Sequence, residues 1–523
     1  MGLETFLNNL HFNTDESTSS TWEVDWEDGP LSYKLYRDLP GIPLSSEVTL
    51  TFENLEVSTE PNLREIGHFL WYVFGITQFC QSTLPAPEIN FMQSYRRFVP
   101  SGGGLYPNEL YIYLKTENVP VGIYHYDVAH HRLVLLREGH FDSYVARALG
   151  NSCDISTCFG VVFVSTMFWK NFFKYHNFSY RLQGLDAGVL IGQLLEVAKR
   201  FQFTSSVHFQ FLDRAINHLL GLSEKEESAY AVIPLSVNSV TPQFNNEDDT
   251  ANKEVSATQL CEELPIIHHN HYVRSRKIAE YPMVIQMNEA SILESTRSFQ
   301  KIKSEANKMH DGQSLVLPRI KRMSYDLAAA CRNRFSPEMD FSFRKMSQEQ
   351  LTTLLYDATA SFTYRNDLDE TYEARMTRVS LYVCLFGIEG IPNGAYHYDS
   401  DAHALRQVYL GDHRLLLQSG MTFHNVNLFQ VPLCIHVVGD KNHLKTALGY
   451  RGYRIQQMEA GILVQKLLLA ASALGLGGHP LLGFKANVCD EIYKLDSEEK
   501  TSLIQIPIGF HRHRPWLKGS LHS

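Results

Sequence analysis

Two pairs of segments far apart in the chain have nearly the same sequence. GIYHYD at Gly122–Asp127 and GAYHYD at Gly394–Asp399 lie 272 residues apart, and YRLQGLDAG at Tyr180–Gly188 and YRIQQMEAG at Tyr453–Gly461 lie 273 residues apart. Two pairs of landmarks at nearly one offset indicate a duplicated domain. With 523 residues the chain is long enough for two sizeable cores. We therefore expect two similar folded units.

Hydrophobic patterns within each copy predict interspersed strands and helices. The first copy has strand-like segments at 110–115, 132–136 and 160–166 and a helical pattern over 180–203; the second has helical patterns at 348–358 and 455–474. A regular alternation of strand and helix is missing, so we predict an α+β fold, present twice, rather than a doubly wound sheet. The expected divisions are an N-terminal arm (1–55), a first domain (56–237), a polar and acidic linker region (238–317) and a second domain (318–523).

Composition limits the partners and the compartment. The net charge of −10 argues against nucleic acid or an anionic membrane surface as the main partner. The first residues have neither the basic nor the apolar region of a secretory signal. The most apolar stretch, Gly461–Gly478, contains Gln465 and Lys466 and indicates a buried helix rather than a membrane span. Eight scattered cysteines without a CxxC pair indicate reduced thiols in a cytoplasmic protein.

Each copy has features that the other lacks. PSGGG at Pro100–Gly104 precedes a strand of the first copy, and three glycines let a backbone approach a flat or anionic ligand closely. The second copy has YEARM at Tyr372–Met376 in this place. The first copy also has Lys174-Tyr175, where the second has Ala447-Leu448.

Basic groups gather in the second copy. It contains Arg334-Phe-Ser336, followed by Ser342 and Arg344, and a late segment HPLLG at His479–Gly483. The chain then runs through GFHRHR at Gly509–Arg514. Arginines of this kind suit a phosphate group, so the anionic part of a ligand is expected in the second half.

Together these motifs resemble the nitroreductase superfamily, in particular its azoline-oxidising branch, the SagB-type or thiazole/oxazole-forming peptide dehydrogenases. PSGGGLYPNELY, the GIYHYD segment and Lys174-Tyr175 ahead of the YR motif carry the resemblance over most of 60–236. Weaker nitroreductase features extend over roughly 318–514.

The resemblance implies a single composite site for flavin mononucleotide (FMN). Members of the superfamily are dimers with FMN at the interface, so the two copies would form a pseudo-dimer within one chain. One side of the site would be formed by Arg334, Ser336, Pro480, Leu482, Gly483 and Arg512 or Arg514. The other side would be formed by Pro100, Ser101, Gly102 and Gly103. Ser342 and Arg344 are the alternative to Arg334 and Ser336, and the pseudo-symmetric second site is expected to be empty.

The resemblance also implies a reaction. The substrate would be a thiazoline or oxazoline ring in a ribosomally made peptide, and the enzyme would act with a cyclodehydratase. Aromatisation removes a proton from Cα and a hydride from Cβ, and FMN takes the hydride. Lys174 and Tyr175 would be the catalytic pair, one as the base and the other orienting it; the sequence does not assign the two roles. Two alternatives are a nicotinamide-dependent nitro- or quinone reductase and a non-catalytic scaffold that binds a leader peptide.

Two further histidine-containing motifs are interpreted as structural. The YHYD segments occur in both copies, including the one without the glycine loop, so we expect them to pack in the core. The run His268-His-Asn-His271 has no carboxylate or thiol at ligand spacing, so an exposed loop is expected and no metal site is predicted.

Overall fold

The computed structural model describes residues 1–17, 23–52, 58, 60–82, 92–237, 254–302, 312–360, 362–370, 378–512 and 517–520. The elements of the first half are α1 (Leu3–His11), α2 (Thr14–Ser17), β1 (Gly41–Pro43), α3 (Leu63–Phe74), β2 (Ile76–Ser82), β3 (Met92–Arg97), β4 (Asn108–Leu114), β5 (Gly122–Asp127), β6 (Arg132–Glu138), α4 (Asp142–Ala148), β7 (Gly160–Met167), α5 (Phe168–Tyr175), α6 (Ser179–Arg200), β8 (Thr204–Val207), α7 (Asp213–Leu220) and β9 (Glu227–Ser236).

Two helices, α8 (Ala257–Glu262) and α9 (Pro282–Ala290), follow. The second half consists of β10 (Ser314–Val316), α10 (Leu327–Asn333), α11 (Gln348–Ala360), β11 (Arg365–Asn366), β12 (Val379–Leu385), β13 (Gly394–Asp399), β14 (Ala404–Leu410), α12 (Arg414–Ser419), β15 (Leu433–Asp440), α13 (Lys445–Leu448), α14 (Arg451–Ala473), β16 (Gly477–Gly478), α15 (Ala486–Tyr493), β17 (Lys500–Gly509) and β18 (Leu517–Ser520).

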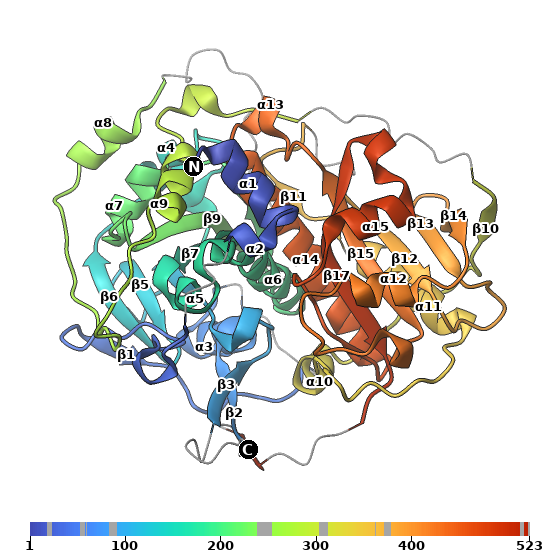
Figure 1. The fold of residues 1–523 in the computed structure, drawn as a ribbon. Helices are drawn as coiled ribbons and strands as arrows, with labels where there is room; N and C mark the ends of the chain where they lie inside the picture. Colours follow the sequence, from blue (N-terminus) through green and yellow to red (C-terminus); the bar gives the residue numbers. More distant parts are fainter. Residues whose placement is uncertain are drawn as a thin grey trace.

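The duplicated sequence folds as two α+β halves, as predicted (Figure 1). The first sheet has the order β1-β6-β5-β4-β7-β9-β8 and the second the equivalent order β10-β14-β13-β12-β15-β17-β16. Neighbouring strands in these two orders are antiparallel. The register repeats as well, because Tyr111 lies opposite His125 in the first half and Tyr382 lies opposite His397 in the second.

The YHYD segments form β5 and β13 and share a tyrosine–histidine contact in the two halves. Tyr126 Oη is 2.8 Å from His131 Nδ1, and Tyr398 Oη is 2.8 Å from His403 Nδ1. All four of these residues belong to or follow the repeated motif, and both tyrosines are buried. The segments therefore pack as structural elements in either half, as expected.

The two halves meet along their longest helices, α6 and α14, which lie side by side between the sheets (Figure 1). The helices approach closely at two equivalent glycines. A Cβ on Gly188 would lie 2.0 Å from the Met458 carbonyl oxygen, and a Cβ on Gly461 would lie 2.3 Å from the Leu185 carbonyl oxygen. Only glycine allows the two backbones to pack at this distance.

The second half also adds two strands to sheets of the first half. The short strand β11 of the second half pairs in parallel with β8, with Arg365 opposite Ser206. The strand β18 pairs with β2 and forms a three-stranded sheet with β2 and β3 (Figure 1). Together with the α6–α14 contact, these strand pairings join the two halves into one unit.

The N-terminal arm and the helices between the halves pack on this core. Leu10 in α1 accepts a hydrogen bond from the buried guanidinium of Arg181 at 2.9 Å. In α9, Val284 and Met287 are fully buried. The linker composition at 238–253 lies outside the described residues, and the division of the chain at 55, 237 and 317 stays a prediction. Among the described residues, no helix is long and apolar enough to span a membrane.

Candidate functional site

The glycine loop forms a tight turn between β3 and β4. Gly102–Gly104 form a single 3-10 turn, in which Gly103 and Gly104 have φ angles of 65° and 70°. These left-handed conformations strain a residue with a Cβ, which explains the glycines. A Cβ on Gly104 would have no atom within 4 Å, so this side of the loop is open to a ligand.

The loop is anchored to α6 through Asp186. Ser101 Oγ donates a hydrogen bond to Asp186 Oδ2 at 2.6 Å, and the Gly102 N–H donates to Oδ1 at 3.2 Å. Ser101 Oγ also accepts a hydrogen bond from the Tyr106 N–H at 2.9 Å. Sequence reasoning missed Asp186, although it belongs to the repeated YRLQGLDAG motif.

Lys174 and Tyr175 lie directly against this loop. They occupy the last turn of α5. A Cβ on Gly103 would meet the Tyr175 hydroxyl at 2.6 Å and the Lys174 Nζ at 3.0 Å. The structure thus brings together two features that are separated by about 70 residues in the sequence and that only the first half has.

The surroundings of the two side chains shift their proton affinities in opposite directions. Burial lowers the pKa of Lys174, and the carboxylate of Glu338 from the second half opposes this shift. Burial raises the pKa of Tyr175, and the charge of Asp186 raises it further. These shifts favour a neutral amine on Lys174 and a protonated phenol on Tyr175.

A buried ionic network fixes α5 to the strand that follows the loop. Lys170 of α5 forms an ion pair with Glu109 and donates to the Tyr106 carbonyl oxygen at 3.2 Å. Glu109 also binds His125 of the YHYD segment at 2.9 Å. Since Tyr106 closes the glycine loop, Lys170 sets the position of the helix that carries Lys174 relative to the loop.

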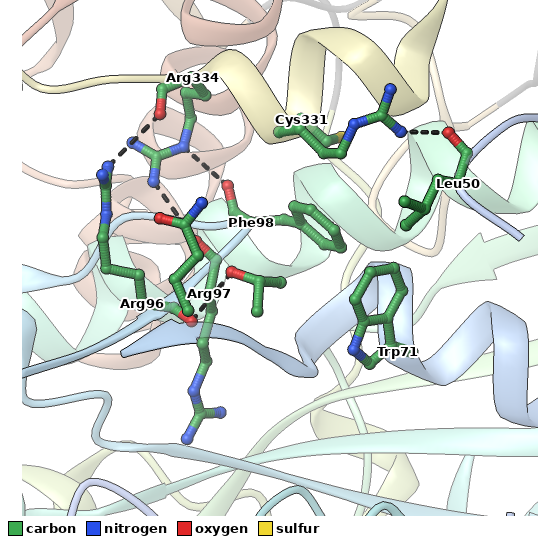
Figure 2. A pocket seen from close by; sticks show the side chains of 10 residues that line it. Leu50, Trp71, Arg96, Arg97, Phe98, Cys331 and Arg334 are labelled. Carbon is green, nitrogen blue, oxygen red and sulfur yellow. Dashed lines mark hydrogen bonds between the residues drawn. The ribbon is translucent and has the colours of Figure 1, made fainter. Parts of the chain in front are cut away.

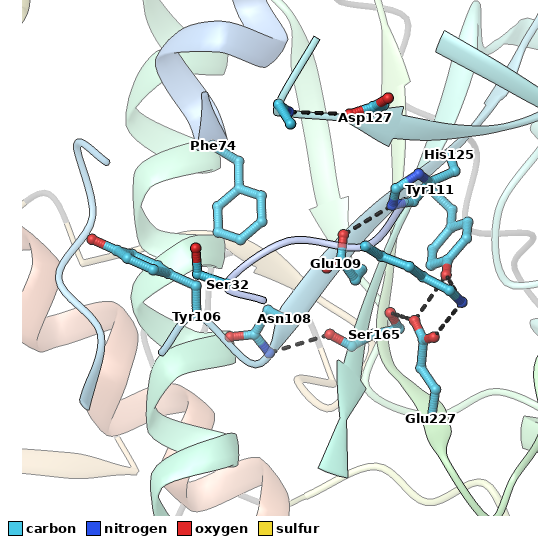
Figure 3. Close-up of polar contacts among 12 residues, drawn as sticks. Ser32, Phe74, Tyr106, Asn108, Glu109, Tyr111, His125, Asp127, Ser165 and Glu227 are labelled. Atoms are coloured by element: carbon cyan, nitrogen blue, oxygen red, sulfur yellow. Dashed lines mark hydrogen bonds and ion pairs between the residues drawn. The ribbon is translucent and has the colours of Figure 1, made fainter. Parts of the chain in front are cut away.

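A second buried ion pair lies beside the first. Lys34 from the N-terminal arm binds Glu227 of β9 at 2.7 Å, and the Tyr111 hydroxyl donates to the same carboxylate at 2.9 Å (Figure 3). Burying charges is costly unless they are paired and hydrogen-bonded. The strand registers show that Ser380 occupies the place of Glu109 in the second half and that Lys500 occupies the place of Glu227. The second half therefore lacks the two carboxylates of these ion pairs.

Arg334 of the second half reaches Phe98, in the segment just before the glycine loop (Figure 2), and Ser336 lies beside it. The Arg334 Nε donates to the Phe98 carbonyl oxygen at 2.7 Å, two residues before Pro100, and its Nη1 donates to Ser336 Oγ at 3.3 Å. Burial and the nearby Arg96 lower the pKa of the buried Arg334 to about 10. The predicted halves of the composite site therefore meet at Phe98.

The arginines at this junction have excess positive charge. Arg96, Arg332 and Arg334 line a small pocket beneath α10 together with Trp71 and Phe98 (Figure 2). None of the described carboxylates lies within 4.0 Å of these three guanidinium groups. Guanidinium groups without a carboxylate partner suit an anionic ligand, so the positive charge here fits a phosphate such as that of FMN.

The end of β17 lies against the segment that follows Arg334. The Arg512 N–H donates to the Asp340 carbonyl oxygen at 2.9 Å, and the His511 ring lies 5.0 Å from the Phe335 ring. The alternative pair is close as well, because the Ser342 N–H donates to the Phe510 carbonyl oxygen at 2.8 Å. Arg344 is exposed beside Phe510. Arg514 lies outside the described residues.

The HPLLG segment lies along β17. The Leu481 N–H donates to the Gln505 carbonyl oxygen at 2.7 Å, and the Gly483 carbonyl oxygen accepts from Thr422 at 2.9 Å. Leu482 is buried, whereas Pro480 is partly exposed. Among the described residues, no hydrogen bond joins Pro480–Gly483 to the glycine loop.

An ion pair fills the equivalent place in the second half. Glu459 of α14 occupies the position of Asp186 in the repeat. Arg378 donates to Glu459 at 2.9 Å and also pairs with Asp369, and the Tyr364 hydroxyl donates to Glu459 at 3.1 Å. The charge of Glu459, the counterpart of Asp186, is therefore neutralised by Arg378.

The histidine run at 268–271 joins the surface of the first half. The His269 Nε2 lies 2.8 Å from the Leu136 carbonyl oxygen. Burial lowers the pKa of His271 to about 4. In the part of the chain that the structure describes, no group of three His, Cys, Asp or Glu side chains could hold a metal ion.

Comparison with known proteins supports a nitroreductase origin. Residues 341–510, most of the second half, match the model of the Nitroreductase family. The whole chain superposes on the crystal structure of a candidate nitroreductase from Anabaena variabilis with a TM-score of 0.72 and 20% identity, covering 98% of this chain and 99% of that one. The fold is therefore that of two tandem nitroreductase-like halves.

Two curated proteins are similar to part of the chain. The trifolitoxin-processing protein TfxB of Rhizobium leguminosarum bv. trifolii is 31% identical over 143 residues, which are 26% of this chain and 38% of TfxB. A candidate nitroreductase of Methanocaldococcus jannaschii is 25% identical over 133 residues, which are 25% of this chain and 64% of that protein. The similarity thus spans less than two thirds of either relative.

Proposed function

We propose that the chain is an FMN-dependent azoline dehydrogenase, a cytoplasmic oxidoreductase that converts thiazoline or oxazoline rings of a ribosomally made peptide into thiazoles or oxazoles. The observation that carries the proposal is the contact of Gly103 with both Lys174 and Tyr175. A nitroreductase used only for small acceptors has no need of such a pair beside its glycine loop.

The residues on either side of the junction fit FMN. The open face of the loop at Gly104 would lie on the flavin ring, with Pro100, Ser101, Gly102 and Gly103 forming that side. The uncompensated Arg334 and its partner Ser336 would hold the phosphate, with Arg512 and Arg514 as further cations. Pro480, Leu482 and Gly483 would form the opposite wall. Bound FMN would supply the hydride acceptor for the Cβ hydrogen of the azoline.

We assign the base to Lys174 and the orienting role to Tyr175. A base must be unprotonated, and burial favours the neutral amine of Lys174. The raised pKa of Tyr175 keeps its phenol protonated, so it is suited to donate a hydrogen bond to the substrate. In this assignment Lys174 Nζ takes the Cα proton and becomes an ammonium ion, for which Glu338 provides a nearby negative charge.

The composite site implies one functional site per chain. The ion pair between Arg378 and Glu459 occupies the pseudo-symmetric position, which supports an empty second site. The proposed domains are those expected from the sequence, with the loop and the catalytic pair in 56–237 and the phosphate side in 318–523. The similarity to a protein whose name records trifolitoxin processing supports a peptide substrate and, with it, a complex with a cyclodehydratase.

The test uses the purified full chain reconstituted with FMN and an azoline-containing peptide. We expect a loss of two hydrogens from the peptide by mass spectrometry, in aerobic buffer without a nicotinamide. The family match and the M. jannaschii relative favour a second candidate, a nicotinamide-dependent nitro- or quinone reductase. Rapid NADH or NADPH oxidation with a nitroaromatic or quinone, and no change in the peptide, would establish that candidate instead. A chain that binds peptide but no flavin would be a scaffold.

A further inference from the structure

The carboxylate of Asp186 has an unusual set of partners for an ionisable group between two long helices. It is held by Ser101 Oγ and by the Gly102 N–H of the glycine loop. None of the described Lys, Arg or His side chains forms an ion pair with it, whereas Glu196 and Glu459 on the same pair of helices each have a cationic partner. Its charge is therefore balanced only by loop donors.

We propose that Asp186 is a positioning residue that holds the glycine loop against Lys174 and Tyr175 in the geometry that the reaction needs. The inference rests on the proposed function, because it assigns Asp186 a role at that same site.

The hydrogen bonds show how one carboxylate can organise the whole loop. Ser101 Oγ donates to Asp186 and accepts from the Tyr106 N–H, so the hydroxyl joins the first and last residues of the turn. A Cβ on Gly102 would lie 2.7 Å from Leu182 Cδ2, so the loop is pressed onto α6. With the turn closed in this way, Gly103 lies next to the Tyr175 hydroxyl.

The charge of Asp186 also acts on the catalytic pair. Burial raises the pKa of Asp186 to about 7, while the two loop hydrogen bonds oppose that shift. The ionised form raises the pKa of Tyr175 and so keeps its phenol protonated. The same residue thus fixes the loop and maintains the donor.

The second half provides the internal comparison. Glu459 occupies the same place in the repeat, and its partners among the described residues are the side chains of Arg378 and Tyr364. In the second half, which lacks the glycine sequence and the Lys-Tyr pair, the carboxylate at this position is bound by an arginine. This difference accords with a role of Asp186 in the site rather than in the fold.

The first test measures amide hydrogen exchange in the FMN-loaded full chain. A hydrogen bond to a charged group contributes about 1.5–3 kcal/mol, so we expect exchange at Gly102 to become about 10- to 150-fold faster in Asp186→Ala. Exchange at Tyr106, whose N–H donates to Ser101 Oγ, should become faster as well because Ser101 loses its partner. Asp186→Asn keeps an acceptor for the Gly102 N–H and should give an intermediate increase. The matched control Glu459→Gln should leave exchange in the loop unchanged.

The second test separates positioning from a general loss of structure. The dissociation constant of FMN should rise about tenfold or more in Asp186→Ala, while exchange within the sheets stays at the wild-type rate. Ser101→Ala should have a smaller effect in the Asp186→Ala background than in the wild type, because the Ser101–Asp186 hydrogen bond is then already absent and only the Tyr106 N–H contact is lost in addition. Unchanged loop exchange and FMN affinity in Asp186→Ala would overturn the proposal. If Asp186→Ala loosens the loop but the wild type oxidises no azoline, Asp186 still anchors the loop and the proposed reaction is wrong.

Discussion

At the residue scale, the account depends on the neighbourhood of Lys174 and Tyr175. A Lys-Tyr pair on a surface helix would ordinarily be solvated and inert, with both pKa values near 10. Here the two side chains lie against Gly103, and burial moves their pKa values in opposite directions. The electrostatics therefore distinguish two roles that the sequence leaves open.

Replacement of the two residues should have different effects. Lys174→Ala should lower kcat by about 10²- to 10⁴-fold, the contribution of a positioned general base. Tyr175→Phe removes only a hydrogen-bond donor and should have a smaller effect on kcat. Both variants should retain FMN, which flavin absorbance after gel filtration would verify. Equal, wild-type turnover of both variants would exclude the pair from catalysis.

The pH profile should report on Lys174 and its neighbour Glu338. Because the neutral amine is the active form, kcat/KM should rise with pH until it passes the pKa of Lys174. Glu338 favours the ammonium form, so Glu338→Gln should lower that pKa and shift the rise to lower pH.

The control for this shift is Glu389→Gln, which removes an exposed carboxylate on the turn between β12 and β13. It should leave the profile in place. A shift of the Glu338→Gln profile to higher pH, or the same shift in Glu389→Gln, would contradict the assignment of the base.

At the scale of elements, the contact between α6 and α14 depends on the absence of two side chains. Alanine in place of a helical glycine usually stabilises a helix by about 1 kcal/mol. A Cβ on Gly188 would lie 2.0 Å from the Met458 carbonyl oxygen, so the helices would have to separate. We expect Gly188→Ala to destabilise the protein by about 1–3 kcal/mol, as overpacked cores do.

The midpoint of urea unfolding measures this effect. Gly192→Ala is the graded comparison, because its Cβ would lie 3.0 Å from Gln465 Cβ and from the Ile462 carbonyl oxygen, a milder contact. It should cost less than Gly188→Ala. A higher midpoint for Gly188→Ala than for the wild type would mean that the helices are not packed as described.

The repeated elements could be predicted from the sequence because their patterns are local. The strands at 110–115 and 160–166 and the helix over 180–203 correspond to β4, β7 and α6 within a few residues. Pairings between distant segments could not be predicted. The two residues of β11 and the four of β18 join sheets of the first half, and segments so short have no distinctive hydrophobic period.

The candidate site was predictable to the same degree. Differences between the two copies pointed to the glycine loop and to Lys174-Tyr175, and the structure places them in contact. The sequence did not predict Asp186 as a site residue, because an acidic residue occupies its position in both copies. Only the spatial partners, Ser101 in one half and Arg378 in the other, distinguish the two carboxylates.

At the scale of the whole molecule, duplication followed by separate loss would give a chain with the one composite site that we propose. The loop and the Lys-Tyr pair come from the first half, and the arginines come from the second. The interlocked sheets and the α6–α14 contact hold the two contributions together without a second subunit. An obligate homodimer would form two such sites, whereas this chain would form one.

The measurement that tests this claim most directly is the amount of flavin bound per chain. The full chain is saturated with FMN, freed of excess ligand and denatured with acid, and the released flavin is identified and quantified by chromatography. The account predicts one FMN per chain. Two per chain would show that the pseudo-symmetric place binds flavin despite Arg378 and Glu459, and none after reconstitution would contradict the flavin site itself.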